Sequence, residues 1–216
     1  MDLWATNPRV WPRFGDMANE VWMMLAQHHG FRRDIARLET AYASSPDDAQ
    51  RAELAKAWDG YAWILHHHHR VEDEHLWPIT QDSAGVLDDM QAQHRIVDPL
   101  IDEISAKVAA GADSADIAAV LGTLGRELNS HLDDEEARAV PLVKETIPAD
   151  VYAAFEDTAR AGIPMDRGPW LFPWLLDDLS GDVNDGLRGQ LPPPMVQMAE
   201  AQWVPGYQEH VTAAFG

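Results

Sequence analysis

The sequence of 216 residues contains no cysteine, and this absence removes several kinds of chemistry at once. Disulfide bonds, thiolate metal sites, iron–sulfur clusters and cysteine nucleophiles are all excluded. A metal site in this chain therefore has to be built from histidine and carboxylate ligands.

Basic residues are also scarce, because 16 lysines and arginines stand against 36 aspartates and glutamates, for a formal net charge of -20. Like charges repel, so we expect neither nucleic acid nor an anionic membrane surface as a partner. Cations are the natural partners of such a chain.

Long apolar runs are missing too. No segment reaches the roughly 18 consecutive apolar residues of a membrane-spanning helix. Residues 1–13 also lack a basic region followed by an apolar run, so they do not resemble a signal peptide. We expect a soluble, cytoplasmic protein.

Hydrophobic residues make up 46% of the chain and recur at helical spacing, which predicts an all-α fold with a sizeable core. The expected helices cover about residues 16–43, 48–75, 86–109 and a stretch from 114 onward. Four amphipathic helices joined by short turns are typical of an up-down-up-down four-helix bundle.

The second of these helices carries the most informative pattern. Its apolar stripe begins at Leu54, continues at steps of three and four to Leu65, and then reaches His68 and Glu72. Residues i and i+4 lie on one face of a helix, so this imidazole and this carboxylate point together into the core. A buried carboxylate without a partner costs several kcal/mol, so the pair needs polar neighbours, water or a metal ion.

Every other helix also places a histidine on its apolar stripe. These residues are His28, His94 and His131, and the last is followed at i+4 by Glu135. His29 lies roughly 100° around the first helix, so we expect His28 to point inward instead.

A single histidine on a core stripe is usually a hydrogen-bonded core residue. Inward histidines on four helices, two of them with a glutamate one turn later, favour a metal site instead. Imidazole and carboxylate ligands suit iron, manganese or zinc, and two carboxylates from different helices can bridge a pair of ions. The predicted ligands are His28, His68, Glu72, His94, His131 and Glu135.

This ordered set, with Leu76-Trp77-Pro78 after the first His-x-x-x-Glu motif and Pro141 after the second, resembles the hemerythrin-like, or HHE cation-binding, family. The resemblance covers about residues 18–145. It implies a hemerythrin-like bundle with a non-haem di-iron centre on the six residues above, with zinc or manganese as possible substitutes. It also implies the broader bacterial branch, whose members bind oxygen, sense oxygen or iron, or handle peroxide and nitric oxide.

The sequence departs from the oxygen-carrying members of that family in two places. Those carriers have a second histidine on the third helix, where this chain has Asp98. Their helix-four carboxylate is an aspartate one residue further along. His69 lies one position off the stripe, so it is either a further ligand or an outer residue, and His66 and His67 are interpreted as surface residues.

Counting coordination positions separates the functional hypotheses. Two six-coordinate ions offer about 12 positions. Four histidines, two bridging carboxylates and a bridging oxygen leave about two positions open, whereas a fifth histidine would leave about one. The sequence thus favours a di-iron protein that reacts with oxygen or peroxide. The alternatives are a carrier or sensor of oxygen or iron, and a bundle in which the metal is structural.

The sequence predicts three parts of the chain. They are an N-terminal arm at 1–15, the bundle at 16–147 and a C-terminal extension at 148–216. The extension is expected to form a short helix at 149–161 and then irregular structure, since 162–216 holds seven of the 14 prolines and seven of the 14 glycines. Its apolar run 168–176 is too short to span a membrane and is expected to cover the bundle or a second copy. The chain is therefore expected to be a monomer or a homodimer.

Overall fold

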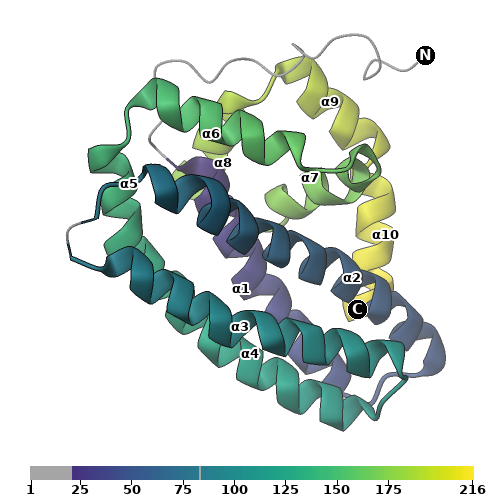
Figure 1. Cartoon of the computed structure of the whole chain (residues 1–216). Coiled ribbons are helices and arrows are strands. Elements are labelled where there is room, and N and C mark those ends of the chain that lie inside the picture. The colour runs from purple at the N-terminus through teal and green to yellow at the C-terminus, as the bar shows by residue number, and fades with distance from the viewer. Residues whose placement is uncertain (1–20, 83) are drawn as a thin grey trace.

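The computed structural model describes residues 21–82 and 84–216, so the predicted arm and the first residues of the first helix lie outside it. Within that range the regular structure is entirely helical (Figure 1). The bundle helices are α1 (Trp22–Ala43), α2 (Asp48–Val71), α3 (Val86–Ala109) and α4 (Ser114–Asp134). The all-α bundle predicted from the sequence is confirmed.

Local signals in the sequence set the helix boundaries. The Asp47 side chain accepts a hydrogen bond from the Gln50 amide at 2.9 Å and so caps the start of α2. Gly85 and Gly111 have φ angles of 75° and 64°, a conformation that only glycine adopts without strain. Gly85 lies directly before α3 and Gly111 lies just after it, so the two glycines mark the limits of that helix.

The bundle core consists of the apolar stripes that face one another. Phe31, Leu65, Ile101 and Leu128 are completely buried in it. Burial of such side chains stabilises the fold by roughly 1.5–3 kcal/mol each. The hydroxyl of Tyr61 also belongs to the core, where it donates to the carbonyl of Phe31 at 3.2 Å.

Two wide helical turns interrupt the bundle at equivalent places. α2 passes into a π-turn at Glu72–Leu76, and α4 passes into a π-turn at Glu135–Ala139. In each case a proline, Pro78 or Pro141, follows the glutamate by the same number of residues. A proline ring clashes with the carbonyl four residues earlier in an α-helix, and the wider turn relieves that clash.

The chain beyond the bundle is helical as well, in short segments. They are α5 (Val140–Thr146), α6 (Ala149–Ala161), α7 (Gly168–Leu176), α8 (Gly181–Gln190), α9 (Pro193–Gln202) and α10 (Val204–Phe215). The predicted helix at 149–161 is present, whereas the prediction of irregular structure after it is wrong. Pro169, Pro193 and Pro205 lie in the first turns of their helices, where the missing N–H is not needed.

Two tryptophans of α7 attach this extension to the bundle. Trp170 and Trp174 stack with ring centroids 5.4 Å apart and lie over glycines on α2 and α1. A Cβ atom at Gly60 would be 2.6 Å from Trp170, and one at Gly30 would be 2.6 Å from Trp174, so both contacts require glycine. The Trp174 indole also donates to Asp34 at 2.8 Å.

A buried ionic network surrounds that hydrogen bond. Arg33 contacts Asp34 at 2.7 Å, and Arg37 reaches Asp177, just after α7, at 2.6 Å. Tyr207 of α10 donates to the same Asp177 at 3.2 Å. Because removing one partner would leave a buried charge uncompensated, this network makes the position of the extension specific.

Candidate metal centre

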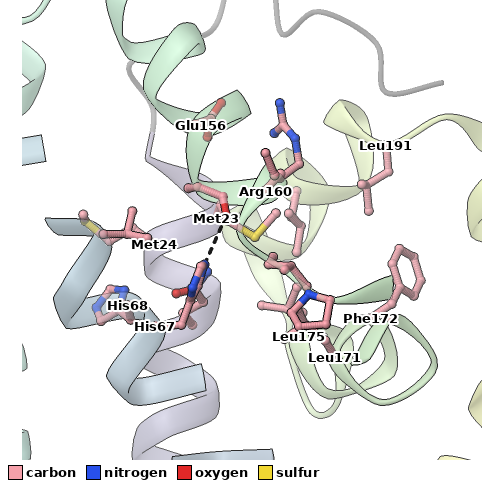
Figure 2. A pocket seen from close by; sticks show the side chains of 18 of the residues that line it. Met23, Met24, His67, His68, Glu156, Arg160, Leu171, Phe172, Leu175 and Leu191 are labelled. Carbon is pink, nitrogen blue, oxygen red and sulfur yellow. Dashed lines mark hydrogen bonds between the residues drawn. The ribbon is translucent and has the colours of Figure 1, made fainter. Parts of the chain in front are cut away.

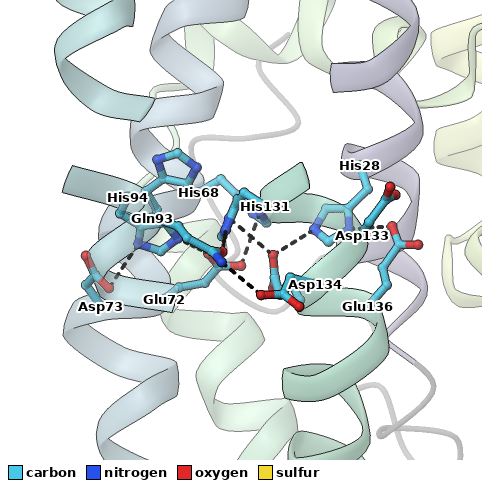
Figure 3. A network of polar contacts seen from close by, with 12 residues as sticks. His28, His68, Glu72, Asp73, Gln93, His94, His131, Asp133, Asp134 and Glu136 are labelled. Atoms are coloured by element: carbon cyan, nitrogen blue, oxygen red, sulfur yellow. Dashed lines mark hydrogen bonds and ion pairs between the residues drawn. The ribbon is translucent and has the colours of Figure 1, made fainter. Parts of the chain in front are cut away.

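The six predicted ligands converge inside the bundle, and His69 joins them. Figure 3 shows five of them, namely His28, His68, Glu72, His94 and His131. Their ligand atoms form two groups, each with all atoms within 4.8 Å of one another. One group is His69, His94 and His131, and the other is His28, His68, Glu72 and Glu135. All seven side chains are buried.

The rings of His28 and His68 lie 5.2 Å apart, although a count of residues from the α1–α2 turn places them roughly 8 Å apart in level. The direction of helical side chains explains the difference. Each leans toward the start of its own helix, so in antiparallel helices the two rings lean toward each other.

Both glutamates belong to the group of His28 and His68, and both also reach the other group. Glu72 Oε1 is 3.2 Å from His68 Nε2, and its Oε2 is 3.6 Å from His94 Nε2. Glu135 Oε2 is 3.4 Å from His28 Nε2 and 3.6 Å from His131 Nε2. Each carboxylate therefore reaches a histidine of both groups, which is the position of a ligand that bridges two ions.

The atoms that face this centre have no hydrogen-bond partner among the residues that the structure describes. They are the Nε2 atoms of all five histidines and both carboxylate oxygens of Glu72 and Glu135. Buried polar atoms are nearly always satisfied, so a cluster of unsatisfied ones points to a missing partner. Because every one is a lone-pair donor, the residues present fit a pair of metal ions.

Burial keeps most of the imidazoles neutral, as metal binding requires. Burial and the neighbouring histidines hold the pKa values of His68 and His69 well below their ordinary range. Burial also lowers the pKa of His131 to about 4, although Glu135 opposes it. At neutral pH these three side chains offer free lone pairs.

The pKa values of the two glutamates shift in opposite directions. Burial, together with the charge of Glu135, raises the pKa of Glu72 well above its ordinary range. Burial acts against Glu135 as well, but His28, His68 and His131 lower its pKa. Burial would also lower the pKa of His28, yet Glu135 and Glu136 raise it to about 8. Two divalent ions would replace these protons as the charge that balances both carboxylates.

Outer partners orient four of the five histidines. His28 Nδ1 lies 2.8 Å from an oxygen of Glu136, and His69 Nδ1 lies 2.6 Å from one of Asp98. His94 Nδ1 lies 3.1 Å from an oxygen of Asp73, and His131 Nδ1 lies 2.9 Å from that of Gln93. A carboxylate or amide oxygen only accepts, so Nδ1 is the donor and Nε2 keeps its lone pair toward the centre. Such partners fix the tautomer and the ring orientation of metal ligands.

The outer partners are themselves held in place. Glu136 accepts a hydrogen bond from Arg32 at 2.7 Å, and Arg32 also contacts Asp133. Gln93 donates to Asp134 at 2.9 Å, which Arg138 contacts at 3.0 Å. These contacts link α1, α3 and α4 around the centre.

The sequence left the role of His69 open, and it placed His67 wrongly. His69 is almost fully buried and its Nε2 faces the centre, because Asp98 on α3 holds its other nitrogen. His67 was interpreted as a surface residue, which is wrong. It is buried under α6, and its Nε2 donates to the carbonyl of Ala159 at 3.1 Å. His29 lies outside both groups, and His66 is partly exposed.

Sequence reasoning missed the outer partners Glu136, Asp73 and Gln93. A signal for them was nevertheless present, because each is adjacent in sequence to a predicted ligand. Successive residues lie about 100° apart around a helix axis, so the neighbour of an inward ligand points to the interface with the next helix.

Comparison with known families agrees with this geometry. Residues 19–143, more than half of the chain, match the family described as hemerythrin HHE cation binding domain. The chain belongs to this family. The resemblance carried by the two His-x-x-x-Glu motifs is thereby confirmed, and the hemerythrin HHE domain covers all seven clustered side chains.

No curated protein and no solved structure gives a significant match to the chain. The HHE domain and its His/Glu cluster together support a metal-binding helical protein. In the part of the chain that the structure describes, no helix is long and apolar enough to cross a membrane.

Proposed function

We propose that this chain holds a non-haem di-iron centre that binds dioxygen reversibly, as a carrier or sensor of oxygen. Such a centre supplies, in its reduced state, the electrons that bind dioxygen. The position of His69 carries the proposal, because its Nε2 lies with those of His94 and His131.

With His69 included, the count of coordination positions differs from the count made on the sequence. Five histidines, two bridging glutamates and a bridging oxygen would occupy about 11 of about 12 positions on two six-coordinate ions. Both glutamates and the bridging oxygen would count for each ion, so the ion beside the three histidines would have about six ligands and the ion beside His28 and His68 about five. The open position would therefore lie on the ion that His28 and His68 would hold.

The protein residues contribute exclusion of water and fixed orientation. The donor atoms are buried, and the apolar side chains of Phe31 and Leu65 lie in the same core. Phe31 lies against His68 with ring centroids 5.2 Å apart. Burial of these donor atoms limits the entry of water and protons, which favours release of oxygen over turnover.

A second candidate function is reaction with oxygen or peroxide, the function that four histidines would favour. One observation supports it. His68 and Glu72 border a cavity that is far larger than a diatomic molecule, so a larger reactant has space near the open position.

Stopped-flow mixing of the reduced, iron-loaded protein with oxygen tests the proposal. We expect two irons per chain, an oxo-bridge charge-transfer band, and a long-lived adduct that releases its oxygen under vacuum. Peroxide turnover above that of free iron would favour the second candidate. Stoichiometric zinc without colour would mean that the metal is structural.

The variant His69→Ala gives a matched comparison. It removes one nitrogen and opens about one further position. We expect the oxygen adduct to become short-lived and peroxide turnover to appear. His75→Ala, a partly exposed histidine that pairs with Glu74 and belongs to neither group, should behave as the unchanged protein does.

A further inference from the structure

A cavity of about 690 Å³ lies between the bundle and the extension (Figure 2). Its walls come from α1, α2, α6, α7 and α9 and are mostly apolar, with Met24, Phe155, Leu171, Phe172 and Met195 among them. Sites for small organic molecules have volumes of roughly 300–1,000 Å³ and apolar walls with few polar groups. The cavity fits that class, and dioxygen alone would not require its size.

The cavity borders the side of the metal centre where the open position is assigned. His68 and Glu72 belong to both its wall and the two-histidine group. His67, the neighbour of His68, also borders the cavity, and its hydrogen bond to Ala159 joins α2 to α6 there (Figure 2).

His68 differs from the other four clustered histidines in its Nδ1 atom. Those four donate Nδ1–H to side chains, whereas His68 Nδ1 has no hydrogen-bond partner within residues 21–82 and 84–216. An imidazole that binds a metal through Nε2 keeps its proton on Nδ1 and needs an acceptor. Since His68 is part of the cavity wall, a molecule in the cavity can supply that acceptor.

The charges around the cavity restrict the molecule further. The chain carries a net charge of -20, and the exposed Asp166 borders the cavity, so an anionic ligand is disfavoured. Of the basic residues on the wall, Arg160 already contacts Asp157, and His67 already contacts Ala159 and Arg70. A cationic group offers no acceptor to His68. An uncharged ketone, ester or alcohol satisfies both conditions.

We infer that this cavity binds an uncharged, apolar organic molecule whose carbonyl or hydroxyl oxygen accepts a hydrogen bond from His68 beside the metal centre. Binding in the cavity requires neither iron nor oxygen. Only the placement next to the open position rests on the proposed function.

Fluorescence titration of the full chain with Nile red, an uncharged dye that carries a carbonyl group, tests the binding. We expect saturable binding at one site and displacement by 2-octanone. Ala159→Phe places a ring in the cavity and should weaken dye binding by about tenfold or more, which corresponds to at least about 1.4 kcal/mol. Ala154→Phe, exposed on the same helix and outside the cavity wall, should leave binding unchanged.

A second variant covers the case in which Ala159→Phe fails to fold. Ala161 borders the cavity but is exposed, so Ala161→Phe adds a ring at the rim without disturbing packed side chains, and it should also weaken the dye. Equal dye affinity in the unchanged chain and in both of these variants would overturn the inference, as would the absence of saturable binding.

The optical spectrum of the cobalt-loaded protein tests the placement. We expect 2-octanone to shift the cobalt absorption bands, and Ala161→Phe to reduce that shift. Dye binding without any spectral shift would overturn the placement next to the metal. Failure of oxygen binding by the iron protein, with dye binding and its loss in the variants intact, would contradict the proposed function and leave the cavity assignment standing.

Discussion

Asp98 Oδ1 lies 2.6 Å from His69 Nδ1. This contact orients a histidine that lies off the apolar stripe so that it becomes a candidate ligand. Asp98 is half-buried and does not belong to either group of ligand atoms. It holds the ring of His69 so that Nε2 faces the centre. The residue that replaces the carriers' additional histidine on the third helix therefore orients a histidine on the second.

Asp98→Ala should weaken metal binding by roughly 10–100-fold, the usual effect of removing an outer partner. The His69 ring would lose its orientation, while every proposed ligand would remain. Competition with a chelator measures the affinity. Asp102→Ala, one turn later and exposed, is the matched control and should bind metal normally.

Glu72→Ala and Glu135→Ala should each abolish tight binding of the metal pair, since each glutamate reaches histidines of both groups. Metal content after dialysis measures this. Glu74→Ala, two residues from Glu72 and exposed, should retain both ions. Two tightly bound irons in either of the first two variants would refute the assignment.

His28→Ala should lose one metal ion per chain, and His29→Ala should lose none, because only His28 belongs to a ligand group. The same metal analysis compares them. Equal losses in the two variants would show that the wrong face of α1 had been assigned.

Glu156→Gln should stabilise the protein in a pH-dependent manner. Burial raises the pKa of Glu156 from 4.5 to about 7. Between these values the unfolded chain loses its proton while the folded chain keeps it, so this residue makes stability fall as pH rises. The glutamine variant lacks this effect.

The free energy of unfolding of Glu156→Gln should therefore match the unchanged protein near pH 4.5 and exceed it by on the order of 2–3 kcal/mol at pH 8. Urea titrations at several pH values measure the difference. Glu145→Gln, on an exposed glutamate, should show no such trend. A constant difference across this range would contradict the buried position of Glu156.

Gly30→Ala should destabilise the fold by about 1–3 kcal/mol, because the new Cβ would lie 2.6 Å from the Trp174 ring. Displacement of this ring also strains its hydrogen bond to Asp34. Gly125→Ala is the control, since its Cβ would meet Ile35 at an ordinary 3.5 Å. That variant should be neutral or slightly stabilising in thermal unfolding, as expected for alanine in a helix.

Helical periodicity predicted the inward histidines because it specifies a direction from one helix alone. Each of His28, His68, His94 and His131 lies on an apolar stripe, and all four are buried at the centre. His67 and His69 could not be placed in this way. Their burial depends on Ala159 and Asp98, which belong to other helices and approach faces of α2 that the stripe does not describe.

The extension shows the same limit in a different form. Its prolines and glycines were taken as signs of irregular structure, yet three of the prolines begin helices. The glycines at 30 and 60 lie inside bundle helices, where the sequence gives no reason for them. Their role depends on Trp174 and Trp170, which are distant in sequence.

Trp174 packs against Phe31 with ring centroids 5.4 Å apart, and Phe31 in turn packs against His68. A fully buried indole is thus separated from a candidate metal ligand by a single phenyl ring. Any absorbing or paramagnetic ion at that ligand would quench the indole's emission at such short range. The contact that attaches the extension to the bundle therefore also gives the protein an intrinsic optical reporter of metal occupancy.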